Sequence, residues 1–204
     1  MKSSNKSSTF FLRGIEPMQK KKPPNPLSKS RTNWCEDKLQ GFKKVLDKKS
    51  LSVVLFDIDY TLFDTAFFKE SGLSQHKIYE EVMQVLDSLN EIAILGIFSK
   101  GEVAFQKTKL EKTGMRKFFE ENNIHIFDDK DANLISVLEK YKDSKLFLVD
   151  DKLGVLCSAK KYMPQVIAIW VKRGPFAQNQ KEIAGFTPDA EIKNLSEVVK
   201  IIRS

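Results

Sequence analysis

From Leu51 onward, short apolar runs alternate with amphipathic stretches of helical length. This alternation is typical of a parallel sheet covered by helices on both faces, because each strand is then buried on both sides. The sequence therefore predicts, over residues 51–204, a doubly wound (Rossmann-like) three-layer α/β/α domain with a central parallel sheet of about five strands. The expected strands are 51–56, 92–98, 124–127, 145–149 and 166–171.

Two of the helices between these strands are indicated by apolar residues spaced three and four apart, which share one side of a helix. The first stripe consists of Ile78, Val82, Val85, Leu86 and Leu89, and the second of Leu134, Ile135, Val137, Leu138 and Tyr141. In a doubly wound sheet, ligands bind beyond the carboxyl ends of the strands. The polar residues that follow each apolar run are therefore the candidate site residues.

The N-terminal part of the chain differs in composition. Residues 1–33 are rich in Ser, Lys, Pro and Asn and lack apolar periodicity, so we expect a disordered basic tail. Residues 34–50 contain a helical stripe that begins at Trp34, which predicts a docking helix and a linker. Residues 1–50 hold 13 Lys and Arg against 4 Asp and Glu, whereas residues 51–204 hold 21 against 23. The basic character thus belongs to the tail, and the predicted domain is nearly neutral.

Several classes of protein are not indicated. The only cysteines, Cys35 and Cys157, are far apart, so neither a disulfide framework nor a thiolate zinc site is expected. No apolar run approaches the roughly 20 residues that span a bilayer. We therefore expect a cytoplasmic protein that does not act at a membrane.

Two carboxylates follow the first expected strand, at Asp57 and Asp59. Carboxylates held this close repel each other unless a cation or a proton lies between them. A second acidic pair, Asp150 and Asp151, follows the fourth expected strand at the same edge of the sheet. Mg²⁺ suits a site of oxygen ligands that also takes phosphate, so the four carboxylates together predict a magnesium site.

Polar residues that suit phosphate follow the second and third strands. Ser99 and Lys100 come directly after the second strand, where a hydroxyl and the backbone N–H groups of the next turn can cradle a phosphate. Lys130 follows the third strand and so lies at the carboxyl edge. Lys140, Lys142 and Lys145 come at the end of the next helix and the start of the fourth strand, at the opposite edge. Lys130 is therefore the candidate cation of the site.

Taken together, these positions resemble the haloacid dehalogenase (HAD) superfamily, which has an Asp-x-Asp-x-Thr motif, a Ser or Thr, a Lys and an acidic motif in that order. The first motif, residues 55–62 (LFDIDYTL), is highly specific, and the resemblance covers roughly residues 51–204. The stretch from 186 to 197 also looks like the end of family members, although that signal is far weaker.

The resemblance implies a Mg²⁺-dependent phosphatase that hydrolyses a phosphate monoester through an aspartyl-phosphate. Asp57 would be the nucleophile, Asp59 the general acid and base, and Lys130 the catalytic cation. Phosphate-binding roles are implied for Thr61, Ser99 and Lys100. Asp57, the backbone carbonyl of Asp59, Asp150 and Asp151 would hold Mg²⁺, and which of Asp150 and Asp151 is the main ligand stays open.

Two further features follow from the resemblance. The dehalogenases and ion-pumping ATPases of the family lack a carboxylate at the position of Asp59, so phosphate-ester hydrolysis is favoured over carbon–halogen chemistry. The gaps from Thr61 to Ser99 and from Ser99 to Lys130 are too short for a large cap domain. The expected substrate is a phosphorylated small molecule or macromolecule, and a homo-oligomer could supply a lid. Tyr60, Phe63, Phe67 and Phe68 either line the entrance or pack beneath it.

Three other interpretations of these residues differ in how well they fit the sequence. A response-regulator receiver domain carries its acidic pair before its phosphorylated Asp, which is the wrong order for this chain. A catalytically weak binding or regulatory module stays open, but the presence of both first-motif carboxylates disfavours it. A nucleic-acid 3′-phosphatase could use the basic tail to neutralise backbone charge, although the low aromatic content of the tail gives base stacking little support.

Overall fold

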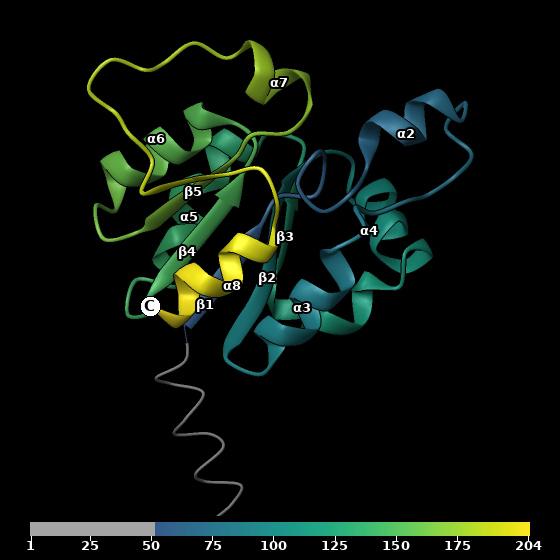
Figure 1. Cartoon of the computed structure of the whole chain (residues 1–204). Coiled ribbons are helices and arrows are strands. Elements are labelled where there is room, and N and C mark those ends of the chain that lie inside the picture. The colour runs from purple at the N-terminus through teal and green to yellow at the C-terminus, as the bar shows by residue number, and fades with distance from the viewer. Residues whose placement is uncertain (1–51) are drawn as a thin grey trace, which may run out of the picture. The chain divides into compact units, whose positions relative to one another are not determined.

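The computed structural model describes residues 52–204, so the predicted tail (1–33), the predicted docking helix (34–50) and Leu51 lie outside the described residues. The described part is built on one six-stranded sheet in the order β3-β2-β1-β4-β5-β6, in which all neighbouring strands run parallel (Figure 1). The predicted α/β class and the parallel sheet are confirmed.

The strands begin and end within two residues of the predicted bounds, with one addition. They are β1 (Ser52–Phe56), β2 (Ala93–Lys100), β3 (Ile124–Phe127), β4 (Leu146–Asp150), β5 (Ile167–Val171) and β6 (Ala190–Ile192). The sixth strand has only three residues, which is too short to give an apolar run in the sequence. Strand β2 extends to Lys100 and β4 to Asp150, so Ser99, Lys100 and Asp150 belong to strands rather than to the loops after them.

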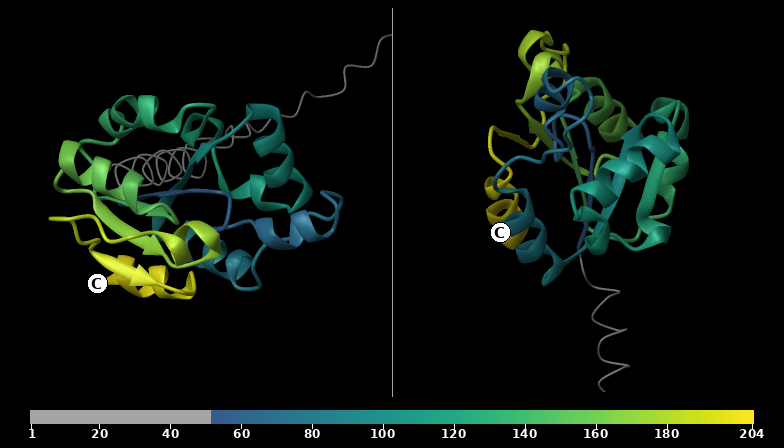
Figure 2. Two further views of the ribbon diagram at one scale, coloured as in Figure 1. Left: turned by 90° about the horizontal axis from the view of Figure 1, so that it is seen from above. Right: turned by 90° about the vertical axis from the view of Figure 1, so that its right-hand side faces the viewer.

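Helices cover both faces of the sheet, as Figure 2 shows from two sides. The structure contains α2 (Thr65–Glu70), α3 (Val82–Asn90), α4 (Val103–Lys112), α5 (Lys130–Glu139), α6 (Leu153–Tyr162), α7 (Gly174–Asn179), α8 (Ser196–Arg203) and the 3-10 helices η1 (Met115–Phe118) and η2 (Glu121–Asn123). None of the helices in residues 52–204 is long and apolar enough to cross a membrane.

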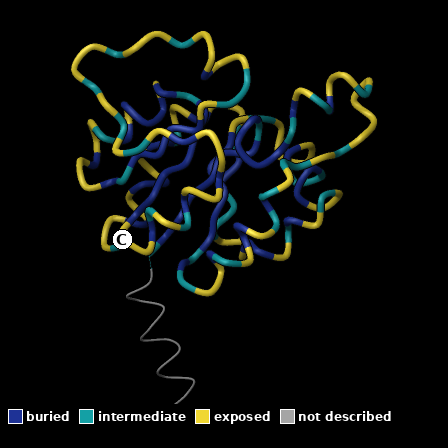
Figure 3. The backbone as a smooth tube through the Cα atoms, in the orientation of Figure 1, coloured by how far each residue is buried: buried dark blue, intermediate teal, exposed yellow. Residues whose placement is uncertain are grey.

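Alternate residues of the strands enter two separate cores. In β1, Val54 and Phe56 pack in the core that contains the buried residues of α3 and α8, whereas Val53 and Leu55 pack in the core that contains those of α5 and α6. This period of two follows from strand geometry, and it explains why the central strands are apolar throughout. Figure 3 shows the buried strands at the centre and exposed backbone along the loop after α7.

The carboxyl ends of β1 and β4 meet where the order of the strands reverses. Strand β1 pairs with β2 on one side and with β4 on the other, so the loop after β1 and the residues after β4 emerge side by side. Such a switch point is where doubly wound sheets bind ligands. Above this edge lie only α2 and α7, each six residues long, and no large cap is present in residues 52–204 (Figure 1).

Gly174, at the start of α7, lies against the loop after β1. It adopts φ +67°, and a Cβ there would meet the ring of Tyr60 well inside van der Waals contact. We expect Gly174→Ala to destabilise the fold by about 2–4 kcal/mol, because the strain of a left-handed alanine adds to an overpacking cost. Chemical denaturation would measure this change in the free energy of unfolding.

Gly185→Ala is a matched control, since Gly185 has φ +75° and nothing within 4 Å of its added Cβ. Gly185→Ala should lower the free energy of unfolding only by the conformational cost of a left-handed alanine, about 1–2 kcal/mol. Equal losses in the two variants would contradict the proposed contact with Tyr60.

Candidate active site

A buried lysine lies between two aspartates at the centre of the candidate site. Lys130 Nζ donates to Asp57 Oδ1 at 2.8 Å and to Asp150 Oδ2 at 2.5 Å. Lys130, Asp57 and Asp150 are 2%, 3% and 0% exposed. Lys130 is the first residue of α5, Asp57 directly follows β1, and Asp150 ends β4, so the sheet edge brings together residues up to 93 positions apart.

Asp151 completes a cluster of three carboxylates. One oxygen from each of Asp57, Asp150 and Asp151 lies within 4.8 Å of the others. Asp150 is already engaged by Lys130 and by the backbone N–H of Lys152, at 2.8 Å. Both carboxylate oxygens of Asp151 are buried without a hydrogen-bond partner among the described residues. Buried unpaired carboxylate oxygens need a partner, and a divalent cation with oxygen ligands fits this donor set.

Two hydroxyl groups of the site also lack a hydrogen-bond partner. Ser99 Oγ and Thr61 Oγ1 are buried and have no hydrogen-bond partner among residues 52–204. Both side chains are at most 1% exposed. They are therefore free to bond to a ligand, and the phosphate-binding role of the two residues stays a prediction.

The charges of the cluster shift one another's ionisation. Burial raises the pKa of Asp57 to about 6, and the charge of Lys130 offsets only part of that effect. Burial and the neighbouring Asp150 raise the pKa of Asp151 to about 8. Burial alone lowers the pKa of Lys130, but Asp150 and Asp57 outweigh it and raise that pKa overall. Additional positive charge would lower the pKa of both acids and keep them ionised.

The Asp59 carboxylate is held apart from this cluster by residues that sequence reasoning missed. Lys109 Nζ donates to its two oxygens at 2.7 and 2.9 Å, Gln106 Nε2 donates at 2.7 Å and Thr65 Oγ1 donates at 2.6 Å. Although burial raises the pKa of Asp59, Lys109 and the hydrogen bonds outweigh it and lower that pKa overall. Asp59 is thus a carboxylate in this arrangement, and its side chain is not among the three clustered carboxylates.

Lys109 and Gln106 lie one helical turn apart on α4, both 3% exposed. Gly101 makes room for Gln106, because a Cβ at this glycine would lie 2.7 Å from Gln106 Nε2. The signal in the sequence was weak, since a lysine and a glutamine on a helix ordinarily face solvent. The side chain of Lys100 is exposed and lies outside the buried cluster, whereas its backbone carbonyl accepts a hydrogen bond from Gln106.

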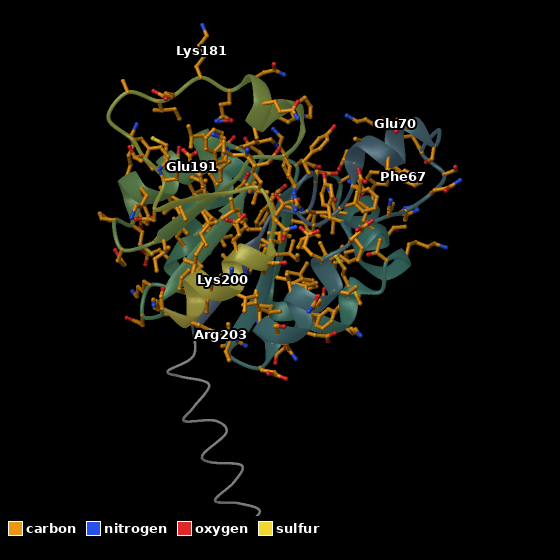
Figure 4. The ribbon with its side chains drawn as sticks, in the orientation of Figure 1. Phe67, Glu70, Lys181, Glu191, Lys200 and Arg203 are labelled. Atoms are coloured by element: carbon orange, nitrogen blue, oxygen red, sulfur yellow. The ribbon has the colours of Figure 1, made fainter. Side chains whose placement is uncertain are left out.

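A cavity of about 440 Å³ opens beside Asp59 and Asp151, and we call it the aromatic pocket. Its lining residues are Asp59, Tyr60, Thr65, Phe68, Lys69, Leu73, Gly101, Phe105, Gln106, Lys109, Asp151, Lys152 and Phe176. Tyr60 and Phe68 line this pocket although both are buried, whereas Phe63 is fully buried in the core and is not in the lining. Phe67 is not in the lining, and Figure 4 shows it on α2 with Glu70.

Comparisons with known proteins bear on the fold. No protein-family model and no curated protein matches the sequence. Among solved structures, a Burkholderia xenovorans protein described as a haloacid dehalogenase-like hydrolase matches with a TM-score of 0.62 and 20% identity, over 74% of this chain and 96% of its own. A Clostridium difficile protein described as a phosphatase matches with a TM-score of 0.59 and 20% identity, over 76% of this chain and 100% of its own.

The HAD-hydrolase YfnB from Bacillus subtilis, whose structure was bound to magnesium, matches with a TM-score of 0.57 and 12% identity, over 76% of this chain and 100% of its own. Dehalogenases also match, so this likeness does not select the reaction. The resemblance predicted from the motifs is confirmed at the level of structure: residues 52–204 have the fold of the HAD-like hydrolases.

Proposed function

We propose that the chain is a Mg²⁺-dependent phosphatase that hydrolyses a phosphate monoester through an aspartyl-phosphate on Asp57. The observation that carries this proposal is the buried ion-paired cluster of Asp57, Lys130 and Asp150, beside the unpaired oxygens of Asp151. Burying three carboxylates with one lysine is costly unless further positive charge is supplied. A catalytic site that binds a cation and a phosphate explains this arrangement better than a structural core does.

The metal ligands in this proposal are Asp57, Asp150 and Asp151, with the backbone carbonyl of Asp59. Asp151 is the main acidic ligand of the last pair, because Asp150 already pairs with Lys130 and the backbone. When bound, Mg²⁺ supplies positive charge that stabilises the developing negative charge of the phosphoryl oxygens. Lys130 supplies the same kind of stabilisation from the protein, and Ser99 and Thr61 have free hydroxyls to offer to the phosphoryl oxygens.

The reaction has two steps. In the first, a carboxylate oxygen of Asp57 bonds to phosphorus while the bond from phosphorus to the leaving oxygen breaks. Asp59, protonated at the start of this step, gives that oxygen its proton and becomes the carboxylate that Lys109, Gln106 and Thr65 hold. In the second, Asp59 takes a proton from water, and the water oxygen attacks phosphorus and releases inorganic phosphate from Asp57. Splitting one displacement into two in this way lowers each barrier. The hydrogen bonds around Asp59 support its role as base, because they favour the ionised form.

Phosphate esters are favoured over carbon–halogen bonds because of Asp59. Carbon–halogen cleavage releases a halide ion, which needs no proton, whereas an ester oxygen leaves more readily when it is protonated. Four donated hydrogen bonds fix the Asp59 carboxylate in the aromatic pocket. A carboxylate fixed in this position can carry a proton to the leaving oxygen of a phosphate ester, which a phosphatase needs.

The physiological substrate is proposed only by class, as a phosphorylated small molecule or macromolecule. Cytoplasmic location and a homo-oligomeric lid stay predictions from the sequence. Nucleic-acid binding through the basic tail (1–33) also stays a prediction, because those residues lie outside the described part of the chain.

We expect Mg²⁺ to be required for phosphate release from 4-nitrophenyl phosphate and also to raise the melting temperature. Binding to the folded state alone stabilises by about 2.7 kcal/mol at 100 times Kd, or several degrees for a domain of this size. Asp151→Asn should lose both responses while still folding, since an amide replaces an unpaired buried acid.

Asp87→Asn serves as the control, because Asp87 is exposed on α3, away from the cluster. It should keep both responses to Mg²⁺. Phosphate release that survives exhaustive chelation would show the metal assignment to be wrong.

A further inference from the structure

The aromatic pocket gathers apolar side chains that folding alone does not bury. Of the six exposed large hydrophobic residues in the described part of the chain, three line this pocket: Leu73, Phe105 and Phe176, at 61%, 44% and 54% exposure. They come from the loop after α2, from α4 and from α7, so they are brought together only by the fold. A gathering of exposed apolar side chains in one cavity indicates a binding site.

The pocket shares a wall with the reacting groups. Asp59 and Asp151 both line it, beside the cluster that contains Asp57. In the proposed mechanism Asp59 protonates the leaving oxygen, so the cavity at Asp59 lies on the side where the leaving group departs. Its occupant is therefore the part of the substrate that is bonded to the phosphoryl group.

The chemistry of the wall selects an aromatic occupant. Tyr60 and Phe176 meet edge to face, with ring centroids 6.5 Å apart, and Phe68 and Phe105 lie 6.0 Å apart at a tilt of 50°. A further ring can extend such edge-to-face arrangements, which exceed the attraction expected from buried area alone. The cavity of about 440 Å³ is in the size range of small-molecule sites.

Two lysines place positive charge along the same wall. Lys69 Nζ donates to Tyr60 Oη at 3.1 Å, and Lys152 Nζ lies 4.9 Å from the centroid of the Phe176 ring. Both residues line the pocket. A doubly negative phosphate ester would be attracted into an apolar cavity with such a rim.

We infer that the aromatic pocket binds the leaving group of the substrate and that this group is an aromatic ring, so that the substrate class is small aryl phosphate monoesters. The inference rests on the proposed function, which places the leaving group at Asp59. It narrows the substrate class, which the motifs leave open.

The first experiment measures binding without turnover. Benzylphosphonate, which cannot be hydrolysed, and methylphosphonate share one head group but differ by the ring. Isothermal titration calorimetry with Mg²⁺ should find benzylphosphonate bound at least about tenfold more tightly, a difference of about 1.4 kcal/mol. Phe176→Ala should remove most of this preference, and Ile135→Ala, a change at an exposed residue of α5, should keep it.

The second experiment measures turnover. The ratio of kcat/KM for 4-nitrophenyl phosphate to that for acetyl phosphate compares a ring with a small group, and both leaving groups depart without much help from a proton donor. Phe105→Ala and Phe176→Ala should each lower this ratio about tenfold, in line with the loss of one aromatic contact. Ile135→Ala should leave it unchanged.

The outcomes separate this inference from the proposed function. If acetyl phosphate is hydrolysed but the two phosphonates bind with equal affinity, the proposed role of the aromatic pocket in binding a ring is wrong. The proposed phosphatase activity is then unaffected. Selective binding of benzylphosphonate that Phe176→Ala weakens, with no turnover of any phosphate ester, would support the pocket and overturn the phosphatase.

Discussion

Asp57→Asn is expected to abolish turnover of every phosphate substrate and to abolish the phosphoenzyme with it. The side chain is almost isosteric and should keep its place beside Lys130, but an amide oxygen is a far poorer nucleophile than a carboxylate. The loss should therefore reach the detection limit of a phosphate-release assay, while the melting temperature shows that the variant is folded.

Asp59→Asn gives the matched comparison, since the same change two residues away removes a proton carrier rather than the nucleophile. It should lower kcat by about 10² to 10⁴, the usual contribution of general acid–base catalysis. With 4-nitrophenyl phosphate the loss should fall mainly on hydrolysis of the phosphoenzyme, which then accumulates. Equal and complete losses in the two variants, with no phosphoenzyme in either, would contradict the division of roles.

Lys130→Met should damage both stability and catalysis. The lysine is the ion-pair partner of Asp57 and Asp150, and its removal leaves buried carboxylates without compensation. Breaking a buried pair on one side costs about 3–5 kcal/mol. Turnover should also fall by at least about a hundredfold, because a charge that stabilises the transition state is lost. Urea denaturation and phosphate release measure the two effects.

A second substitution separates charge from packing. Lys130→Met combined with Asp150→Asn removes one of the two carboxylate charges that lost their ion-pair partner. The double variant should recover part of the lost stability but none of the activity. Lys142→Met, a change at an exposed lysine that pairs with Glu139 near the surface, should change stability by less than about 1 kcal/mol. A Lys130→Met variant as stable as the wild type would show that Lys130 does not neutralise the cluster.

Much of the fold could be predicted from the sequence because buried parallel strands leave an apolar run wherever they occur. The runs at β1 and β4 gave both the strands and the carboxylates that follow them. Strand β6 was not predicted, because three residues at the edge of a sheet bury little surface. Ile135 was placed on a buried stripe but is 51% exposed, since spacing alone does not fix how wide the buried face of a helix is.

Parts of the site were predictable for the same reason. Lys130 could be chosen from many lysines because topology puts the start of α5 at the carboxyl edge of the sheet. The contacts of Lys109 and Gln106 with Asp59 could not be predicted, because they join residues 50 and 47 positions apart through the packing of α4 against the loop after β1. Pairing of this kind leaves no periodic pattern in the sequence.

The central claim, that Asp57 is the nucleophile, is tested most directly by trapping the intermediate. Asp59→Asn protein is mixed with 4-nitrophenyl phosphate and Mg²⁺, quenched in acid and digested, and the mass of each peptide is measured. We expect one phosphate on the peptide that contains Asp57, located at that residue by fragmentation and absent from the Asp57→Asn protein. A phosphate on any other residue, or substantial turnover by Asp57→Asn, would contradict this claim.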